Sequence, residues 1–200
     1  MTDLFKEKAR DWDTNDIVRS LSLAIGAAIR ANVELNATMR VMDFGAGTGL
    51  ITSQIADKVE KVTAVDVSRA MLDKLLAKDD LQGKVEALCQ NILEQPLSIG
   101  FDLIVSAMAM HHVEDTDKLV ACFAAHLKPG GKIALADLDE EDGTFHPADI
   151  EGVYHAGFNR AALAAVLSRH EFTDIRFMTA HTIAKDHKFY PVFLVLANRA

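Results

Sequence analysis

The sequence predicts an open α/β fold, in which helices cover both faces of a mostly parallel sheet. From residue 41 to residue 167, short apolar runs alternate with segments whose apolar residues recur at helical spacing. The last two apolar runs, 175–178 and 192–197, are joined by a turn too short for a parallel crossover, so we expect them to pair antiparallel. Two hundred residues suit a single domain, 1–200, with room for six or seven strands.

The chain begins with a polar segment and an amphipathic helix, which we expect over 15–31. Thr14, Asn15 and Asp16 are the candidate N-caps of this helix. We interpret residues 1–35 as an N-terminal helical cap, whose first part is either a lid over a ligand or an ordinary surface segment packed through Trp12. A polar insert, 139–157, is expected on the substrate side. Parallel strands are predicted at 41–44, 62–65, 84–89, 101–106 and 132–138.

Helices are predicted after three of these strands and near the C-terminus. Ile51, Ile55 and Val59 share one helical face, and Ser68 can cap the next helix. The segment 90–100 contains a proline and is too short for a full helix. The remaining helices are expected from Thr116 to the Pro129-Gly130 turn, and from Asn159, as its cap, through Leu163, Val166 and Leu167.

Composition favours a small-molecule ligand over nucleic acid. The formal net charge is −8, and no run of Lys and Arg forms the basic patch or stripe that is typical of nucleic-acid binding. The N-terminus has no apolar signal core, and no stretch is long enough to span a membrane. Cys89 and Cys122 lie in apolar segments without a CxxC pattern, so we expect reduced core thiols in a cytoplasmic protein.

The stretch from Val41 to Leu50 predicts a ligand loop between a strand and a helix. The apolar run ends in Gly45, Gly47 and Gly49, and glycine allows positive φ and close approach of backbone N–H groups to a ligand. Leu50 stands where the dinucleotide fingerprint needs its third glycine, and no Lys-Ser/Thr pair follows, which excludes a P-loop. A plain tight turn is the structural alternative.

Asp66 strengthens the ligand interpretation. It ends the next apolar run, 62–65, and lies 66 − 45 = 21 positions after Gly45. This is close to the separation of about 20 expected for a carboxylate that binds ribose hydroxyls. The alternative role for Asp66 is a carboxylate at a helix N-terminus.

Four segments in order resemble the motifs of class I S-adenosylmethionine-dependent methyltransferases. They are 43–49 (DFGAGTG), 64–68 (AVDVS), 101–106 (FDLIVS) and 127–132 (LKPGGK), and the resemblance covers about 35–200. It implies a Rossmann-like three-layer αβα sandwich with strand order 3-2-1-4-5-7-6 and strand 7 antiparallel. It also implies S-adenosylmethionine as the cofactor and S-adenosylhomocysteine as the product.

The resemblance implies a role for each cofactor-binding residue. The glycines admit the cofactor's amino-acid portion, Asp43 orients the loop or the ammonium group, and Asp66 accepts from the ribose. Val67 packs on adenine, and a residue after the third strand meets the adenine amino group. The implied residues are Asp43, Gly45, Ala46, Gly47, Gly49, Asp66, Val67, Asn91, Ile92, Ser106 and Ala107.

Two further stretches carry candidate chemistry. His111 and His112 follow the fourth strand, where a histidine either acts as the base for a protonated substrate, or only packs the loop or hydrogen-bonds the cofactor. In the insert, His146, Tyr154 and His155 are candidate substrate residues, with a solvated structural loop as the alternative. The spacing of carboxylates and histidines there fits no standard metal site, so we expect no metal.

These observations predict a methyltransferase that acts on an O, C or N atom of a small organic molecule. The alternatives are a tRNA or protein methyltransferase, which normally needs a basic or appended recognition region, and a non-catalytic S-adenosylmethionine-binding protein. The glycine spacing disfavours NAD-dependent redox chemistry. We expect a monomer or homodimer, with no membrane or nucleic-acid partner.

Overall fold

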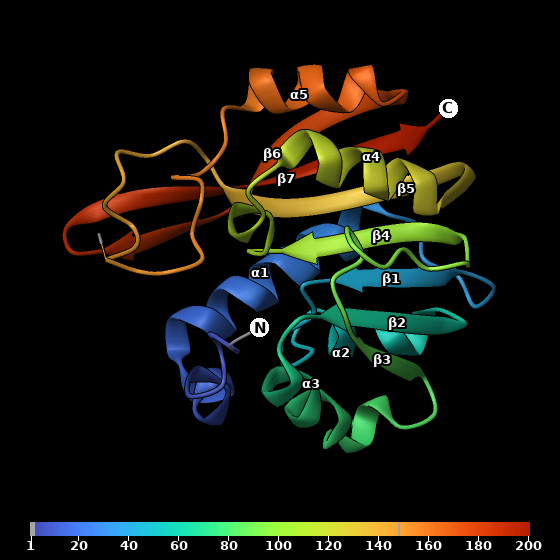
Figure 1. Ribbon diagram of the computed structural model, residues 1–200, viewed down its shortest axis with the longest axis horizontal. Coiled ribbons are helices and arrows are strands. Elements are labelled where there is room, and N and C mark those ends of the chain that lie inside the picture. The colour runs from blue at the N-terminus through green and yellow to red at the C-terminus, as the bar shows by residue number, and fades with distance from the viewer. Residues whose placement is uncertain (1–2, 148) are drawn as a thin grey trace.

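The computed structural model describes residues 3–147 and 149–200 (Figure 1). Residues 1–2 of the predicted cap and residue 148 of the predicted insert lie outside the described residues. Seven strands form one sheet: β1 (Arg40–Phe44), β2 (Lys61–Asp66), β3 (Val85–Cys89), β4 (Phe101–Ala107), β5 (Leu127–Leu138), β6 (Phe172–Lys185) and β7 (Lys188–Arg199).

The strand order is β3-β2-β1-β4-β5-β7-β6, as the resemblance implied. β1 to β5 pair in parallel, and β7 lies antiparallel between β5 and β6. The predicted fold class and the antiparallel C-terminal pair are therefore confirmed. β6 and β7 are longer than predicted, and they form a hairpin that extends beyond the other strands (Figure 1).

Five α-helices complete the layers: α1 (Asp16–Asn32), α2 (Thr52–Ile55), α3 (Arg69–Leu76), α4 (Thr116–His126) and α5 (Arg160–Arg169). Residues of α1, α2 and α3 pack on one face of the sheet, and residues of α4 and α5 pack on the other. The predicted caps are confirmed, because Asn15, Ser68 and Asn159 each accept hydrogen bonds from the first turn of their helix. Residues 90–100 cross from β3 to β4 without a helix, as predicted.

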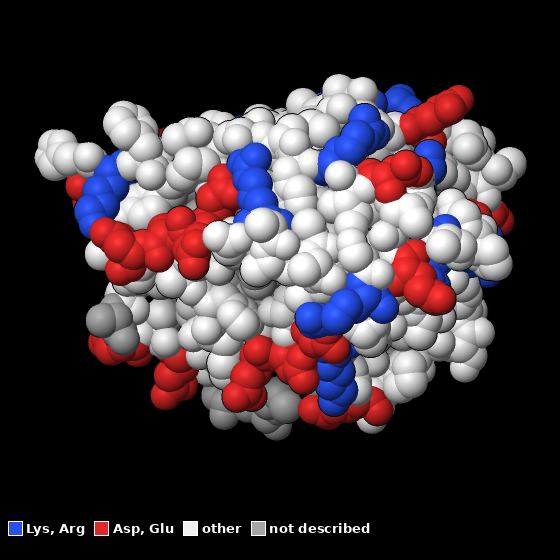
Figure 2. All heavy atoms as spheres, turned by 90° about the horizontal axis from the view of Figure 1, so that it is seen from above, with Lys and Arg blue, Asp and Glu red and all other residues white. Residues whose placement is uncertain are grey.

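Charge is dispersed over the surface. Figure 2 shows Lys and Arg side chains interspersed with Asp and Glu on the face seen from above, with the acidic side chains in the majority. This matches the net charge of −8. On that face the basic groups do not merge into a stripe that would follow a phosphate backbone.

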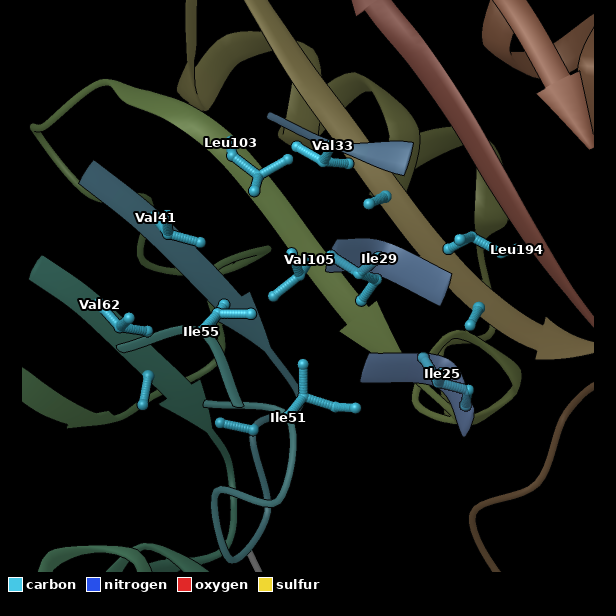
Figure 3. Packing of buried hydrophobic residues seen from close by; sticks show 14 of the residues in the cluster. Ile25, Ile29, Val33, Val41, Ile51, Ile55, Val62, Leu103, Val105 and Leu194 are labelled. Atoms are coloured by element: carbon cyan, nitrogen blue, oxygen red, sulfur yellow. The ribbon is translucent and has the colours of Figure 1, made fainter. Parts of the chain in front are cut away.

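The central strands are buried on both faces, as expected for a parallel sheet covered by helices. Along β4, Leu103 and Val105 enter the core under α1, whereas Ile104 enters the core under α4. Ile25 and Ile29 of α1 reach the first of these cores, beside residues of β1, β2 and β7 (Figure 3).

Three predictions of local structure are wrong. The helix after the glycine loop was expected to include Val59, but the α-helix ends at Ile55 and is followed by one 3₁₀ turn. Val59 is extended and leads the chain into β2. The Pro129-Gly130 turn lies inside β5: pairing with β4 jumps from Phe101↔Leu127 to Leu103↔Lys132, and the extra residues form a bulge. Cys89 is exposed, not a core thiol, because β3 is an edge strand.

We expect Ile29→Ala to destabilise the protein strongly, because Ile29 is fully buried between α1 and the sheet. Truncating a buried Ile leaves a cavity and costs about 2–5 kcal/mol of unfolding free energy. Leu23→Ala in the same helix is the matched control, because Leu23 is 59% exposed and should change stability by less than about 0.5 kcal/mol. Urea unfolding measures both, and equal losses would contradict this packing of α1.

Candidate functional site

The glycine loop follows β1, and part of its backbone is free of contacts with other protein atoms. Gly45, Gly47 and Gly49 all have positive φ. A Cβ on Gly45 would lie 2.2 Å from the Cβ of Ala109, so glycine is required there for close packing. A Cβ on Gly47 would meet no protein atom within 4 Å. The backbone at Gly47 therefore faces space that a ligand can approach.

Asp66 connects this loop to the start of α3. Its Oδ2 accepts from the Gly47 N–H at 2.8 Å, and its Oδ1 accepts from the Ser68 N–H at 2.8 Å. Burial raises its pKa above the usual range. Each carboxylate oxygen can accept a further hydrogen bond, so the two ribose hydroxyls of a nucleoside fit its remaining capacity. The adjacent Val67 is 55% exposed and offers an apolar surface.

Asp43 is a buried carboxyl at the C-terminal end of β1. The Thr52 hydroxyl donates to its Oδ2 at 2.5 Å. Burial raises its pKa to about 7, and the charge of Asp66 acts in the same direction. A cation bound nearby, such as an ammonium or a sulfonium, would stabilise the ionised form of this carboxyl. The pair Asp43 and Asp66 therefore fits a positively charged ligand.

The other residues of the predicted cofactor site differ in how free their side chains are. The buried Oγ of Ser106, near the end of β4, has no hydrogen-bond partner among the described residues. Asn91 uses its side chain locally, accepting from the Leu93 N–H and donating to Glu94. Ile92 is buried in the core under α4. Of these, Ser106 has the side chain that a ligand would satisfy.

A buried, hydrogen-bonded pair of side chains lies beside the end of β4. His111 Nδ1 is 2.7 Å from Asp137 Oδ1, with 2% and 0% of the two side chains exposed. Asp137 Oδ2 accepts from the backbone N–H groups of Met110 and His111, at 3.0 and 3.2 Å. Because an ionised carboxylate only accepts, His111 Nδ1 carries the proton and Nε2 holds the lone pair when the ring is neutral.

Asp137 was not among the candidate site residues predicted from the sequence. The sequence feature that could have identified Asp137 is its position near the C-terminal end of β5, a strand that pairs in parallel with β4. Its carboxylate therefore lies at the same sheet edge as the residues that follow β4.

His112 and His146 lie against this pair. Their ring centroids are 4.2 and 5.0 Å from that of His111. His112 Nδ1 donates to the Gly152 carbonyl at 2.6 Å. Burial, followed by the charge of His111, lowers the pKa of His112 and of His146 to about 4, so both rings are neutral at pH 7. The structure thus brings together three of the predicted histidines from two separate stretches.

Tyr154 and His155 are not part of that group. The Tyr154 side chain is 56% exposed, and its backbone N–H donates to the His111 carbonyl. His155 Nε2 is 2.9 Å from the Val113 carbonyl oxygen and 3.3 Å from Thr116 Oγ1. In this arrangement both residues hold the insert against the segment that carries the histidines.

The segment before α1 lies across the whole site. Asp3 accepts from the Ser68 hydroxyl at 2.9 Å, and the Phe5 ring lies edge-on to the His112 ring, 5.2 Å between centroids. Asp13 accepts from the Thr48 hydroxyl in the glycine loop and pairs with Lys78. One segment thus contacts both the glycine-loop end of the site and the histidine end.

Within 3–147 and 149–200, no helix is long and apolar enough to cross a bilayer. No group of three or more His, Cys, Asp or Glu side chains in these ranges is placed to hold a metal ion.

Comparison with known proteins agrees with this geometry. A family model described as a methyltransferase domain matches residues 41–131. An uncharacterised methyltransferase of Bacillus cereus is 29% identical over 196 residues, covering 95% of this chain and 90% of that protein. One of Schizosaccharomyces pombe is 32% identical over 135 residues, covering 60% of this chain and 48% of that protein, so the chain spans about half of its length.

Solved structures share the fold at low sequence identity. A Haloferax volcanii putative methyltransferase, in complex with the Trm112 methyltransferase activator, has a TM-score of 0.78 at 16% identity and covers 99% of this chain and 98% of that one. Haemonchus contortus phosphoethanolamine N-methyltransferase 2, in complex with S-adenosyl-L-methionine, has a TM-score of 0.72 at 18% identity and covers 96% and 56%. The motifs, the strand order and these matches agree with one another, and together they support a class I S-adenosylmethionine-dependent methyltransferase.

Proposed function

We propose that this methyltransferase modifies an O, C or N atom of a small organic molecule, and that His111 is the base for the reaction. The buried pair of His111 and Asp137 is the observation that carries the proposal. A base is needed only where the accepting atom arrives protonated, as in a phenol, an enol or an amine. A histidine held in one orientation by a buried carboxylate suits that task.

The cofactor supplies an electrophilic methyl group on a sulfonium that is already a good leaving group. In our proposal, Asp43 and the backbone at Gly47 hold its amino-acid portion, and Asp66 holds the ribose. Val67 packs against the adenine. Ser106 and Ala107 line the space between the cofactor and the histidines, because β4 ends between the glycine loop and β5.

Alignment supplies most of the rate, since displacement requires the accepting atom in line with the breaking bond. His111 Nε2 takes the proton of the accepting atom, while Asp137 fixes the tautomer and stabilises the charged ring. His112 is the weaker candidate for the base. Its Nδ1–H is engaged by the Gly152 carbonyl, and its pKa is lowered to about 4.

Net charge supports a small acceptor over a nucleic acid. The net charge is −8, and on the face seen in Figure 2 basic groups are interspersed with acidic ones.

The second candidate is a methyltransferase that acts on a macromolecule with an activator protein. It is favoured by the structural likeness over 99% of the chain to a methyltransferase in complex with such an activator. The purified chain alone should bind the cofactor in the first case and should require the partner in the second.

Titration of the purified chain with S-adenosylmethionine and S-adenosylhomocysteine tests the cofactor site. Both should raise the melting temperature, since each binds only the folded state. Asp66→Ala should weaken S-adenosylhomocysteine binding about tenfold or more, because hydrogen bonds to a charged group are lost. Asp142→Ala is the matched control: Asp142 is an exposed carboxylate paired with Lys188, and its loss should leave the affinity unchanged. Equal affinities of the two variants by calorimetry would contradict the assignment.

Asp137→Asn tests the base, once a panel of phenols, quinone precursors, small amines and small acids has given a methyl acceptor. The turnover number should fall about 100-fold or more, the range of general base catalysis, while S-adenosylhomocysteine affinity stays within about threefold. The acidic limb of the pH–rate profile should also move, which a purely structural loss would not cause. Asp139→Asn is the control, because it makes the same change two positions away, at a carboxylate that pairs with Arg160 and not with His111. An unchanged turnover number in Asp137→Asn would overturn the assignment.

A further inference from the structure

The three histidines His111, His112 and His146, here called the histidine cluster, pack against one another. Their rings lie within 6.3 Å of one another, centroid to centroid. The buried Nε2 of His146 has no hydrogen-bond partner within 3–147 and 149–200. A buried polar atom without a partner costs free energy, so a ligand that satisfies this nitrogen would recover that cost.

Two lysines lie near the histidine cluster, each over an aromatic ring that packs against one of the histidines. Lys185 Nζ donates to the Phe145 carbonyl and lies 5.3 Å from the centroid of the Phe145 ring, which is 4.8 Å from the His146 ring. Lys8 Nζ lies 5.3 Å from the centroid of Phe5, whose ring packs on His112. Both lysines and the neighbouring histidines act on His146 in the same direction, each lowering its pKa.

The carboxylates nearby are already engaged. Asp137 touches the histidine cluster, but each of its oxygens accepts two hydrogen bonds, from His111 and from the backbone of 110–111 and 138. Glu141, on the same loop as His146, accepts from the Thr144 and Phe145 N–H groups. Asp142 pairs with Lys188. These carboxylates are therefore bound within the protein, and none of them is hydrogen-bonded to the Nε2 of His146.

We propose that the histidine cluster, with Lys8 and Lys185, binds a negatively charged carboxylate or phosphate group on the methyl acceptor. This inference rests on the proposed function, because it places the acceptor beside His111. An anion favours protonation of His112 and His146 and then receives charge-assisted hydrogen bonds from them. It also makes His111 a stronger base, since the ring becomes charged as it takes the acceptor's proton.

The test uses small probes on the protein saturated with S-adenosylhomocysteine and, in parallel, on the protein alone. Benzoate and inorganic phosphate are compared with neutral benzamide, at ionic strength matched with sodium chloride. At least one anion should raise the melting temperature, with little effect of benzamide. Its affinity should rise severalfold from about pH 8 to about pH 6, because binding takes up protons onto rings whose pKa is low in the free protein.

His146→Gln and Lys185→Met should each reduce the stabilisation by the anion while keeping that by S-adenosylhomocysteine. Lys188→Met is the matched control, since Lys188 lies on the same hairpin but pairs with Asp142. Equal stabilisation by benzamide and the anions, stabilisation by neither, or equal effects of Lys188→Met and His146→Gln would overturn the inference. Loss of the S-adenosylhomocysteine response, in contrast, would refute the proposed cofactor site. The titration of the protein alone would still decide whether the cluster binds anions.

Discussion

Parallel pairing of β1, β2, β4 and β5 is the constraint on which the site depends. The register places Phe44 opposite Val65 and Ser106, and Ala107 opposite Ala136. The four strands therefore end at one edge of the sheet, and whatever follows each strand is brought to its neighbours. Residues that lie far apart along the chain, such as Asp66 and His111, are brought to the same edge of the sheet in this way.

The site is built at a cost to stability. A parallel sheet covered on both faces favours apolar residues, yet Asp43, Ser106 and Asp137 lie in its strands with almost no exposure. Asp137 and Asp43 are accommodated by hydrogen bonds, whereas the Ser106 hydroxyl lacks a partner among the described residues. Buried polar groups that break the local pattern are concentrated at functional sites, because selection retains them for binding and chemistry.

The sequence predicted well what depends on local pattern. The caps Asn15, Ser68 and Asn159 were found because a cap and its helix are adjacent in the chain. The glycine loop and Asp66 were found because their spacing is set by one strand–helix–strand unit. The full strand order, however, came from the resemblance to a family, since periodicity alone does not specify which strands are neighbours.

The features that sequence reasoning missed depend on tertiary contacts. The bulge around Pro129 depends on the register between β4 and β5. The pairing of Asp137 with His111 joins residues that are 26 positions apart, at the ends of two strands.

In our proposals, the two ends of the site bind groups of opposite charge. Buried carboxyls at the glycine loop suit the cationic cofactor, and the histidine cluster with its lysines suits, in our proposal, an anionic acceptor. Methyl transfer from a sulfonium removes the positive charge on sulfur, and an accepting atom that has lost its proton to the base gives up its negative charge as the new bond forms. Such a reaction is slowed by water, which stabilises the separated charges more than the transition state. The segment before α1, which contacts Ser68 at one end and His112 at the other, lies where it would exclude water from both.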